Sequence, residues 1–147
     1  MKKLFLLVAV MLIGMISFAQ SDYTYSLTTT NDAKGNTWDY ADTLTNGETL
    51  DAIIRVKSPN VMDLSFQVVT DEISGTGTYT LTLYGSNDGT TFLAVTDSTV
   101  SISAALTADG SGWVKANDWN YSYVKLLMTS TGTETSRHKC YYSFRKE

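Results

Sequence analysis

Apolar and polar residues alternate with a period of two along much of this chain, and that pattern restricts its fold more than any other feature. Successive side chains of a β-strand point to opposite faces, so the alternation indicates strands with one buried face. After residue 20 no stretch repeats apolar residues at the spacing of an amphipathic helix. The clearest alternating runs are 23–28, 62–68, 79–83, 123–128 and 138–144. Weaker strands are expected near 37–44, 50–57, 91–96, 99–103 and 112–116.

Clusters of Gly, Asn, Asp and Ser separate these runs at short intervals. Gly supplies positive φ, and Asn and Asp tolerate it, so such clusters are typical of turns. Thr and Ser contribute 36 of the 128 residues after position 19, and Thr favours the pleated surface of a sheet. Many short strands joined by turns predict a single all-β domain over 20–147, an antiparallel β-sandwich of the jelly-roll type. The turn clusters lie at 31–36, 46–47, 58–60, 74–77, 85–89, 109–112 and 130–133.

The first 19 residues have the three-part pattern of a secretory signal peptide. Lys2 and Lys3 make a positive start, an uncharged apolar run covers 4–18, and small residues precede a cleavage site before Gln20. The apolar run is shorter than the ~20 residues that a membrane-spanning helix needs. We therefore expect a hydrophobic leader helix over 1–19 and an exported protein (periplasmic, extracellular or virion-associated). Membrane contact is expected only through 4–18, if the leader is retained.

Composition excludes several classes of function. After position 19 the chain carries 9 basic and 15 acidic residues, a net charge of −6, whereas nucleic-acid binders usually have a basic excess. We therefore expect no nucleic-acid partner. One Cys and one His cannot build an intramolecular disulfide or a Cys₂His₂ zinc site, so neither is expected and no metal-ligating residue is assigned from them.

The lone histidine, His138, lies two residues from the lone cysteine, Cys140. On one strand their Cβ atoms would be ~6.5–7 Å apart, too far for the direct hydrogen bond that activates a nucleophile. A structural histidine beside a buried cysteine fits this spacing better. No GxSxG, HExxH or phosphate-loop motif is present, and most acidic residues fall in turns, which they cap. We expect no enzymatic activity.

Residues 79–95 form the best-defined local unit, two strands around the turn Asn87-Asp88-Gly89. Asp-Gly is among the strongest hairpin signals, so these residues are expected first to make the turn. Their oxygens, with those of other acidic turns, are also candidate ligands for a structural Ca²⁺. Because the EF-hand spacing is absent, the sequence leaves open whether a Ca²⁺ binds here. No other cofactor is expected.

A second candidate site lies around Trp119, which follows Asp118 and precedes Asn120. An exposed ring flanked by Asp and Asn suits sugar binding, because it combines an apolar face with hydrogen-bonding groups. Tyr121 and Tyr123 extend this candidate binding surface. The alternative stays open that Trp119 fills the core, as tryptophans of small sandwiches often do. The other two tryptophans are weaker candidates.

The segment 81–92, LTLYGSNDGTTF, resembles a pattern of bacteriophage virion accessory proteins of the decoration or fibre type. In those proteins a strand ends in a GSNDGT turn and an aromatic residue opens the next strand. The YVKL strand at 123–126, a Gly-Thr turn and the final strand at 137–144 extend the likeness over 79–145. The same hairpin is similar to discoidin and other galactose-binding jelly rolls. The resemblance implies a β-sandwich and, on the phage side, a structural role in a virion.

These patterns predict an exported, non-enzymatic structural or adhesion module that acts by protein–protein contact. Tyr and Trp are enriched at interfaces, so the outward tyrosines indicate contact with a second copy or with other structural proteins. The alternative is a secreted carbohydrate-binding module of a bacterial cell surface. It would bind glycans through Trp119 and the neighbouring tyrosines.

Overall fold

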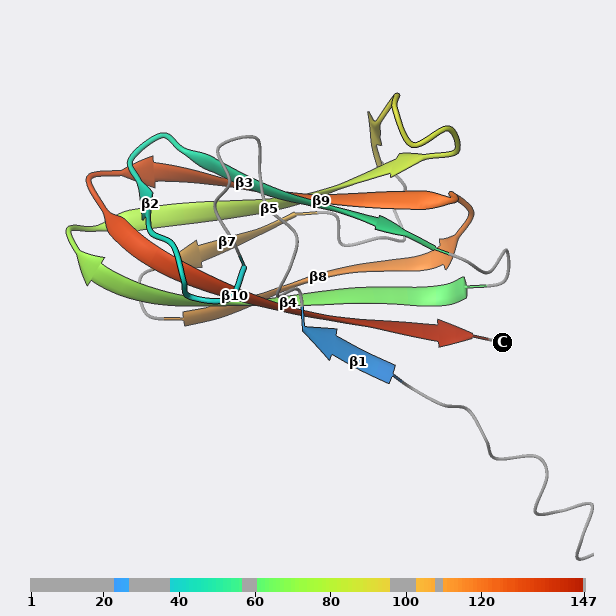
Figure 1. Ribbon diagram of the computed structural model, residues 1–147, viewed down its shortest axis with the longest axis horizontal. Helices are drawn as coiled ribbons and strands as arrows, with labels where there is room; N and C mark the ends of the chain where they lie inside the picture. The colour runs from blue at the N-terminus through green and yellow to red at the C-terminus, as the bar shows by residue number, and fades with distance from the viewer. Residues whose placement is uncertain (1–22, 27–37, 57–60, 96–102, 108–109, 147) are drawn as a thin grey trace, which may run out of the picture.

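The protein is built from two antiparallel β-sheets packed face to face, as the computed structural model shows for residues 23–26, 38–56, 61–95, 103–107 and 110–146 (Figure 1). The leader predicted over 1–19 and most of the strand predicted near 99–103 lie outside these residues. In the part of the chain that the structure describes, no helix is long and apolar enough to cross a membrane. The all-β, two-sheet prediction is confirmed.

The first sheet, called sheet A here, has the strand order β1-β10-β4-β8, and the short β2 also pairs with β10. Because β1 and β2 pair with different parts of β10, they form one interrupted edge. Its strands are β1 (Tyr23–Ser26), β2 (Leu44–Thr45), β4 (Val61–Ser74), β8 (Gly110–Trp119) and β10 (Thr135–Lys146).

The second sheet, sheet B, has the order β3-β9-β5-β6, and β7 also pairs with β5. Here β6 and β7 share one edge, since they pair with successive parts of β5. Its strands are β3 (Thr49–Arg55), β5 (Gly77–Ser86), β6 (Leu93–Ala94), β7 (Ser103–Thr107) and β9 (Tyr123–Gly132).

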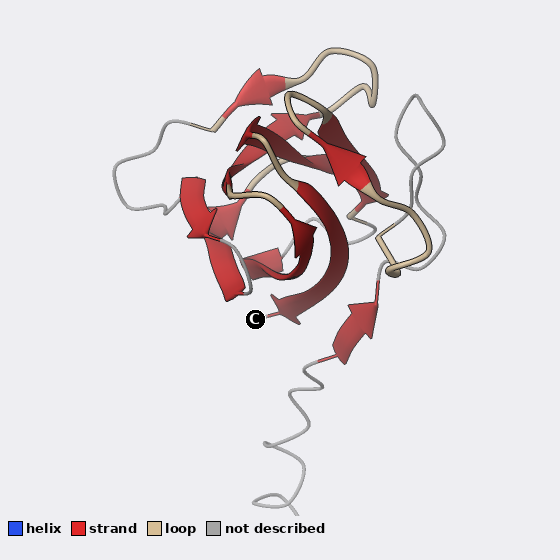
Figure 2. Ribbon diagram, turned by 90° about the vertical axis from the view of Figure 1, so that its left-hand side faces the viewer, coloured by secondary structure: helices blue, strands red, loops and turns tan. Residues whose placement is uncertain are grey.

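The chain crosses between the sheets at almost every step, which gives the jelly-roll topology. From β2 to β5, and again from β7 to β10, consecutive strands lie in opposite sheets. Counting each interrupted edge as one strand leaves eight strands in two four-stranded layers, the arrangement of a double-sheet jelly roll. Figure 2 shows the curved strands wrapping around the interior from one end.

The core lies between the sheets and is filled by the apolar half of each alternating run. On β4 the side chains of Leu64, Phe66 and Val68 are fully buried, whereas the residues between them face outward. The same alternation holds along β5, β8 and β9. The pattern read from the sequence therefore sets which side chains each sheet presents to solvent.

Trp38 closes one open side of the sandwich. Its ring is fully buried, and its indole Nε1 donates a hydrogen bond of 3.1 Å to the carbonyl of Asp51 on β3. On the other side, the backbone N–H of Cys140 on β10 donates to the carbonyl of Trp38 at 3.3 Å. The segment thus joins one edge of each sheet and protects both from pairing with other strands.

Candidate functional site

The predicted turn at Asn87, Asp88 and Gly89 forms with its own internal hydrogen bonds. Asp88 Oδ1 accepts bonds of 2.8 Å from the backbone N–H groups of Thr90 and Thr91 and from the hydroxyl of Ser86. The two backbone N–H groups, with Thr91 contributing most, hold the pKa of Asp88 well below its ordinary value. The carboxylate is therefore used mainly to fold the turn.

The sequence left open whether Trp119 stacks on a sugar or fills the core; in the structure its side chain faces the core and is 3% exposed. Asp118 has a φ of 52°, a left-handed conformation that breaks the alternation at the end of β8 and turns the next side chain inward. The edge of the Trp119 ring meets Tyr121 at 5.2 Å between centroids. Tyr121 is 37% exposed, so it is the ring of this pair that solvent reaches.

The structure brings the two predicted candidate sites together at one end of the sandwich. The backbone N–H of Ser122 donates to Asn87 Oδ1 at 3.1 Å. Gly89, at a φ of 75°, lies so close to the Tyr123 ring that a Cβ there would be 3.0 Å from Cζ. These contacts join the two turns into one rigid cluster, a juxtaposition set by strand pairing between β5 and β9.

His138 and Cys140 lie inside the sandwich rather than in an accessible site. His138 Nδ1 is 3.1 Å from Thr70 Oγ1, and its Nε2 is 2.9 Å from Ser136 Oγ. Burial lowers the pKa of His138 to about 4 and raises the pKa of the Cys140 thiol. This is the structural histidine beside a buried cysteine that the spacing predicts.

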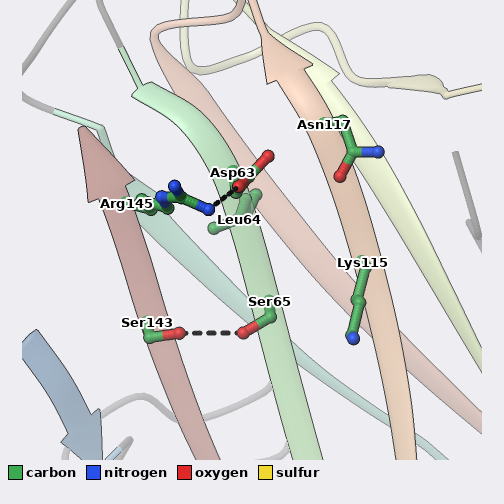
Figure 3. Close-up of a pocket in the computed structure, with 7 residues that line it drawn as sticks. All are labelled: Asp63, Leu64, Ser65, Lys115, Asn117, Ser143 and Arg145. Carbon is green, nitrogen blue, oxygen red and sulfur yellow. Dashed lines mark hydrogen bonds and ion pairs between the residues drawn. The ribbon is translucent and has the colours of Figure 1, made fainter. Parts of the chain in front are cut away.

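The outer face of sheet A carries a polar groove of about 390 Å³ (Figure 3). Ser65 on β4 and Ser143 on β10 lie opposite each other in register and share a hydrogen bond of 2.8 Å. An ion pair of 3.4 Å between Arg145 and Asp63 stands at one end. The groove is lined by Asp63, Leu64, Ser65, Lys115, Asn117, Ser143 and Arg145.

On the outer face of sheet A, cationic side chains stand over aromatic rings. Lys115 Nζ is 5.8 Å from the centroid of Trp113, whose ring is 49% exposed. Lys139 Nζ is 5.4 Å from the Tyr141 ring and 5.9 Å from the Tyr40 ring. Such contacts hold the rings in place while leaving part of each open to a partner. Sequence reasoning ranked Trp113 low, although alternation along β8 places it on the outer face.

The outer face of sheet B carries an apolar patch, called the sheet B patch here. One cross-strand row joins Ile53 on β3, Lys125 on β9 and Tyr84 on β5. Lys125 Nζ stands 5.1 Å from the Tyr84 centroid and 5.3 Å from the Phe92 centroid. Ile53 is 46% exposed. The patch therefore offers aromatic and aliphatic surface around one cation.

Among the residues that the structure describes, no three His, Cys, Asp or Glu side chains gather closely enough to hold a metal ion. Asp88 and Asn87 each already accept backbone N–H groups of the turns. The surfaces described above offer hydrogen-bonding groups, charges and aromatic rings.

The fold is similar to that of several solved structures. One is the PBSX exported protein XepA, with a TM-score of 0.59 and 11% identity over 85% of this chain and 37% of that one. Another is the VP2 subviral particle of infectious bursal disease virus, with a TM-score of 0.54 and 10% identity over 89% of this chain and 34% of that one. No protein-family model and no curated protein sequence matches the chain.

These likenesses show the double-sheet β-sandwich fold, at identities too low to carry a function. The chain spans about a third of the length of each of the two proteins compared.

Proposed function

We propose that this protein is an exported, non-enzymatic structural module that acts by protein–protein contact, and that the sheet B patch binds a second copy of the chain. The observation that carries the proposal is the exposure of Ile53 beside the Tyr84 and Phe92 rings on one sheet face. Large apolar side chains in one exposed patch mark an interaction surface more often than singly scattered ones do.

The composition of the patch supports contact with protein. Aromatic side chains are enriched in interfaces because they bury a large area for few rotatable bonds. Lys125 stands over two of the rings, and Asp51 on the same outer face supplies an opposite charge that a facing copy can pair with Lys125. The fold-level likeness to the protein of a subviral particle and to an exported protein agrees with this role.

Sedimentation of paired variants tests the proposal. Ile53→Lys puts a charge in the centre of the patch. Ile73→Lys is the control, because it makes the same change on β4 of sheet A, where Ile73 is 50% exposed and so matches Ile53 at 46%. We expect the native chain and Ile73→Lys to sediment as the same oligomer and Ile53→Lys to sediment as a monomer. An unchanged oligomer in Ile53→Lys, or a monomeric native chain, would refute contact through this patch.

The carbohydrate-binding alternative loses its original anchor, because the Trp119 ring is buried. One specific observation still favours glycan binding, the half-exposed Trp113 ring beside the polar groove of sheet A. That surface lies on the opposite sheet from the patch, so the two functions are separable by mutation.

A further inference from the structure

The groove on sheet A exists because two small side chains interrupt a face of larger ones. Ser65 and Ser143 are cross-strand partners at its floor, and Lys115 pairs with Ser65 from the other side. Bulkier pairs stand on both sides, with Trp113 opposite Gln67 in one neighbouring row. The volume of about 390 Å³ falls within the ~300–1,000 Å³ typical of small-ligand sites.

The lining groups are polar, and cations exceed anions. Lys115 and Arg145 face a single carboxylate, Asp63, which leaves one positive charge in excess. The Asp63 and Arg145 side chains are 41% and 54% exposed, so water screens their ion pair and a ligand can exchange with it. The chain as a whole has a net charge of −4, so this local excess runs against the overall charge. It favours an anionic group in the groove.

Trp113 adds an apolar platform next to these charges. It lies two residues before Lys115 on β8, on the same outer face, and its ring is 49% exposed. The other two tryptophans, Trp38 and Trp119, are buried. An inorganic anion would use the charges and leave the ring unused. A ligand that uses both needs an acidic group, several hydroxyls and an apolar ring face.

We propose that this groove binds an acidic saccharide, a short uronic-acid chain. Lys115 and Arg145 pair with its carboxylate, Asn117 and the floor serines hydrogen-bond its hydroxyls, and Trp113 packs against a sugar ring. The groove is a hydrogen-bonding surface distributed over three strands, β4, β8 and β10, as Figure 3 shows. The proposal is independent of assembly through sheet B.

Titration with trigalacturonate, and with neutral maltotriose and a tri-aspartate peptide as comparison probes, tests this site. We expect trigalacturonate to change the tryptophan fluorescence with a Kd below ~1 mM, and both comparison probes to bind at least tenfold more weakly. Lys115→Gln should weaken binding about tenfold, because it removes a charge-assisted hydrogen bond. Trp113→Ala should abolish the fluorescence change, and calorimetry should show binding weakened at least tenfold.

Lys139→Gln is the matched control, since Lys139 also stands over an aromatic ring on the outer face of sheet A but is not among the residues that line the groove. Its affinity should stay within twofold of the native value. Absence of saturable binding up to ~10 mM trigalacturonate would overturn the proposal. Equal binding of maltotriose would overturn the proposal that the ligand must be acidic. Equal binding of tri-aspartate would overturn the proposal that the ligand is a saccharide. Equal losses in Lys115→Gln and Lys139→Gln would show that overall charge, rather than this groove, binds the probe.

Discussion

Buried His138 makes the stability of the sandwich depend on pH in a defined window. Burial lowers its pKa from 6.5 to about 4, so between these values the unfolded chain takes up a proton that the folded chain does not. Stability is therefore full above pH 6.5 and falls as the pH drops toward 4. The unfolding free energy falls by about 3 kcal/mol in total, because each pH unit between the two pKa values contributes about 1.36 kcal/mol.

Urea unfolding at pH 7.5, 6.5, 5.5 and 4.5 measures this loss, and the chain offers a direct second assay. Because His138 is the only histidine, its imidazole gives one set of NMR signals, and their titration reports its pKa without ambiguity. We expect no change in those signals down to about pH 5.

His138→Gln is the control, because an amide can still hydrogen-bond the hydroxyls of Thr70 and Ser136 but does not titrate. Its stability should be nearly flat between pH 6.5 and 5, where carboxyl groups contribute little. A histidine that titrates near pH 6.5, or equal pH dependence in the native chain and His138→Gln, would refute the burial argument.

Three further predictions follow from single positions. Trp119→Ala should cost about 3–5 kcal/mol of unfolding free energy in urea, as a core truncation does, whereas a purely ligand-binding ring would cost little. Gly75→Ala should lower the unfolding free energy by about 1–3 kcal/mol, because the φ is 87° and the new Cβ would lie 2.2 Å from the Thr133 carbonyl oxygen; an unchanged urea midpoint would contradict this. Expression in a secreting bacterial host should yield a chain whose intact mass corresponds to a start at Gln20. An intact mass that corresponds to a start at Met1 would show that the leader is retained.

Local pattern was enough to predict the long strands and their buried faces, whereas the strand expected near 37–44 is reduced in the described residues to an isolated bridge at Asp39 and the short β2. The run from Met62 to Val68 predicts a strand with alternate residues inside, and β4 has this arrangement. The structure extends β4 to Ser74, because its polar end pairs with β10. That pairing is a long-range contact and leaves no periodic signal in the polar residues themselves.

The surfaces could not be predicted because distant pairs create them. Ser65 and Ser143 form the groove floor although 78 residues separate them. The sequence left the position of Trp119 open, because its inward direction depends on Asp118, whose left-handed conformation alternation does not reveal. Trp113, in contrast, could have been found, because it falls on the outward half of a regular strand.

The most direct test of the central claim is the reactivity of a cysteine placed in the sheet B patch. Cys140 is buried and its thiol pKa is raised, so in Ile53→Cys the introduced thiol alone should react rapidly with a maleimide. If the patch binds a second copy, the reaction should slow as the protein concentration rises from ~1 to ~100 µM, while Ile73→Cys reacts at a constant rate. An Ile53→Cys rate that does not change with concentration would contradict assembly through this face.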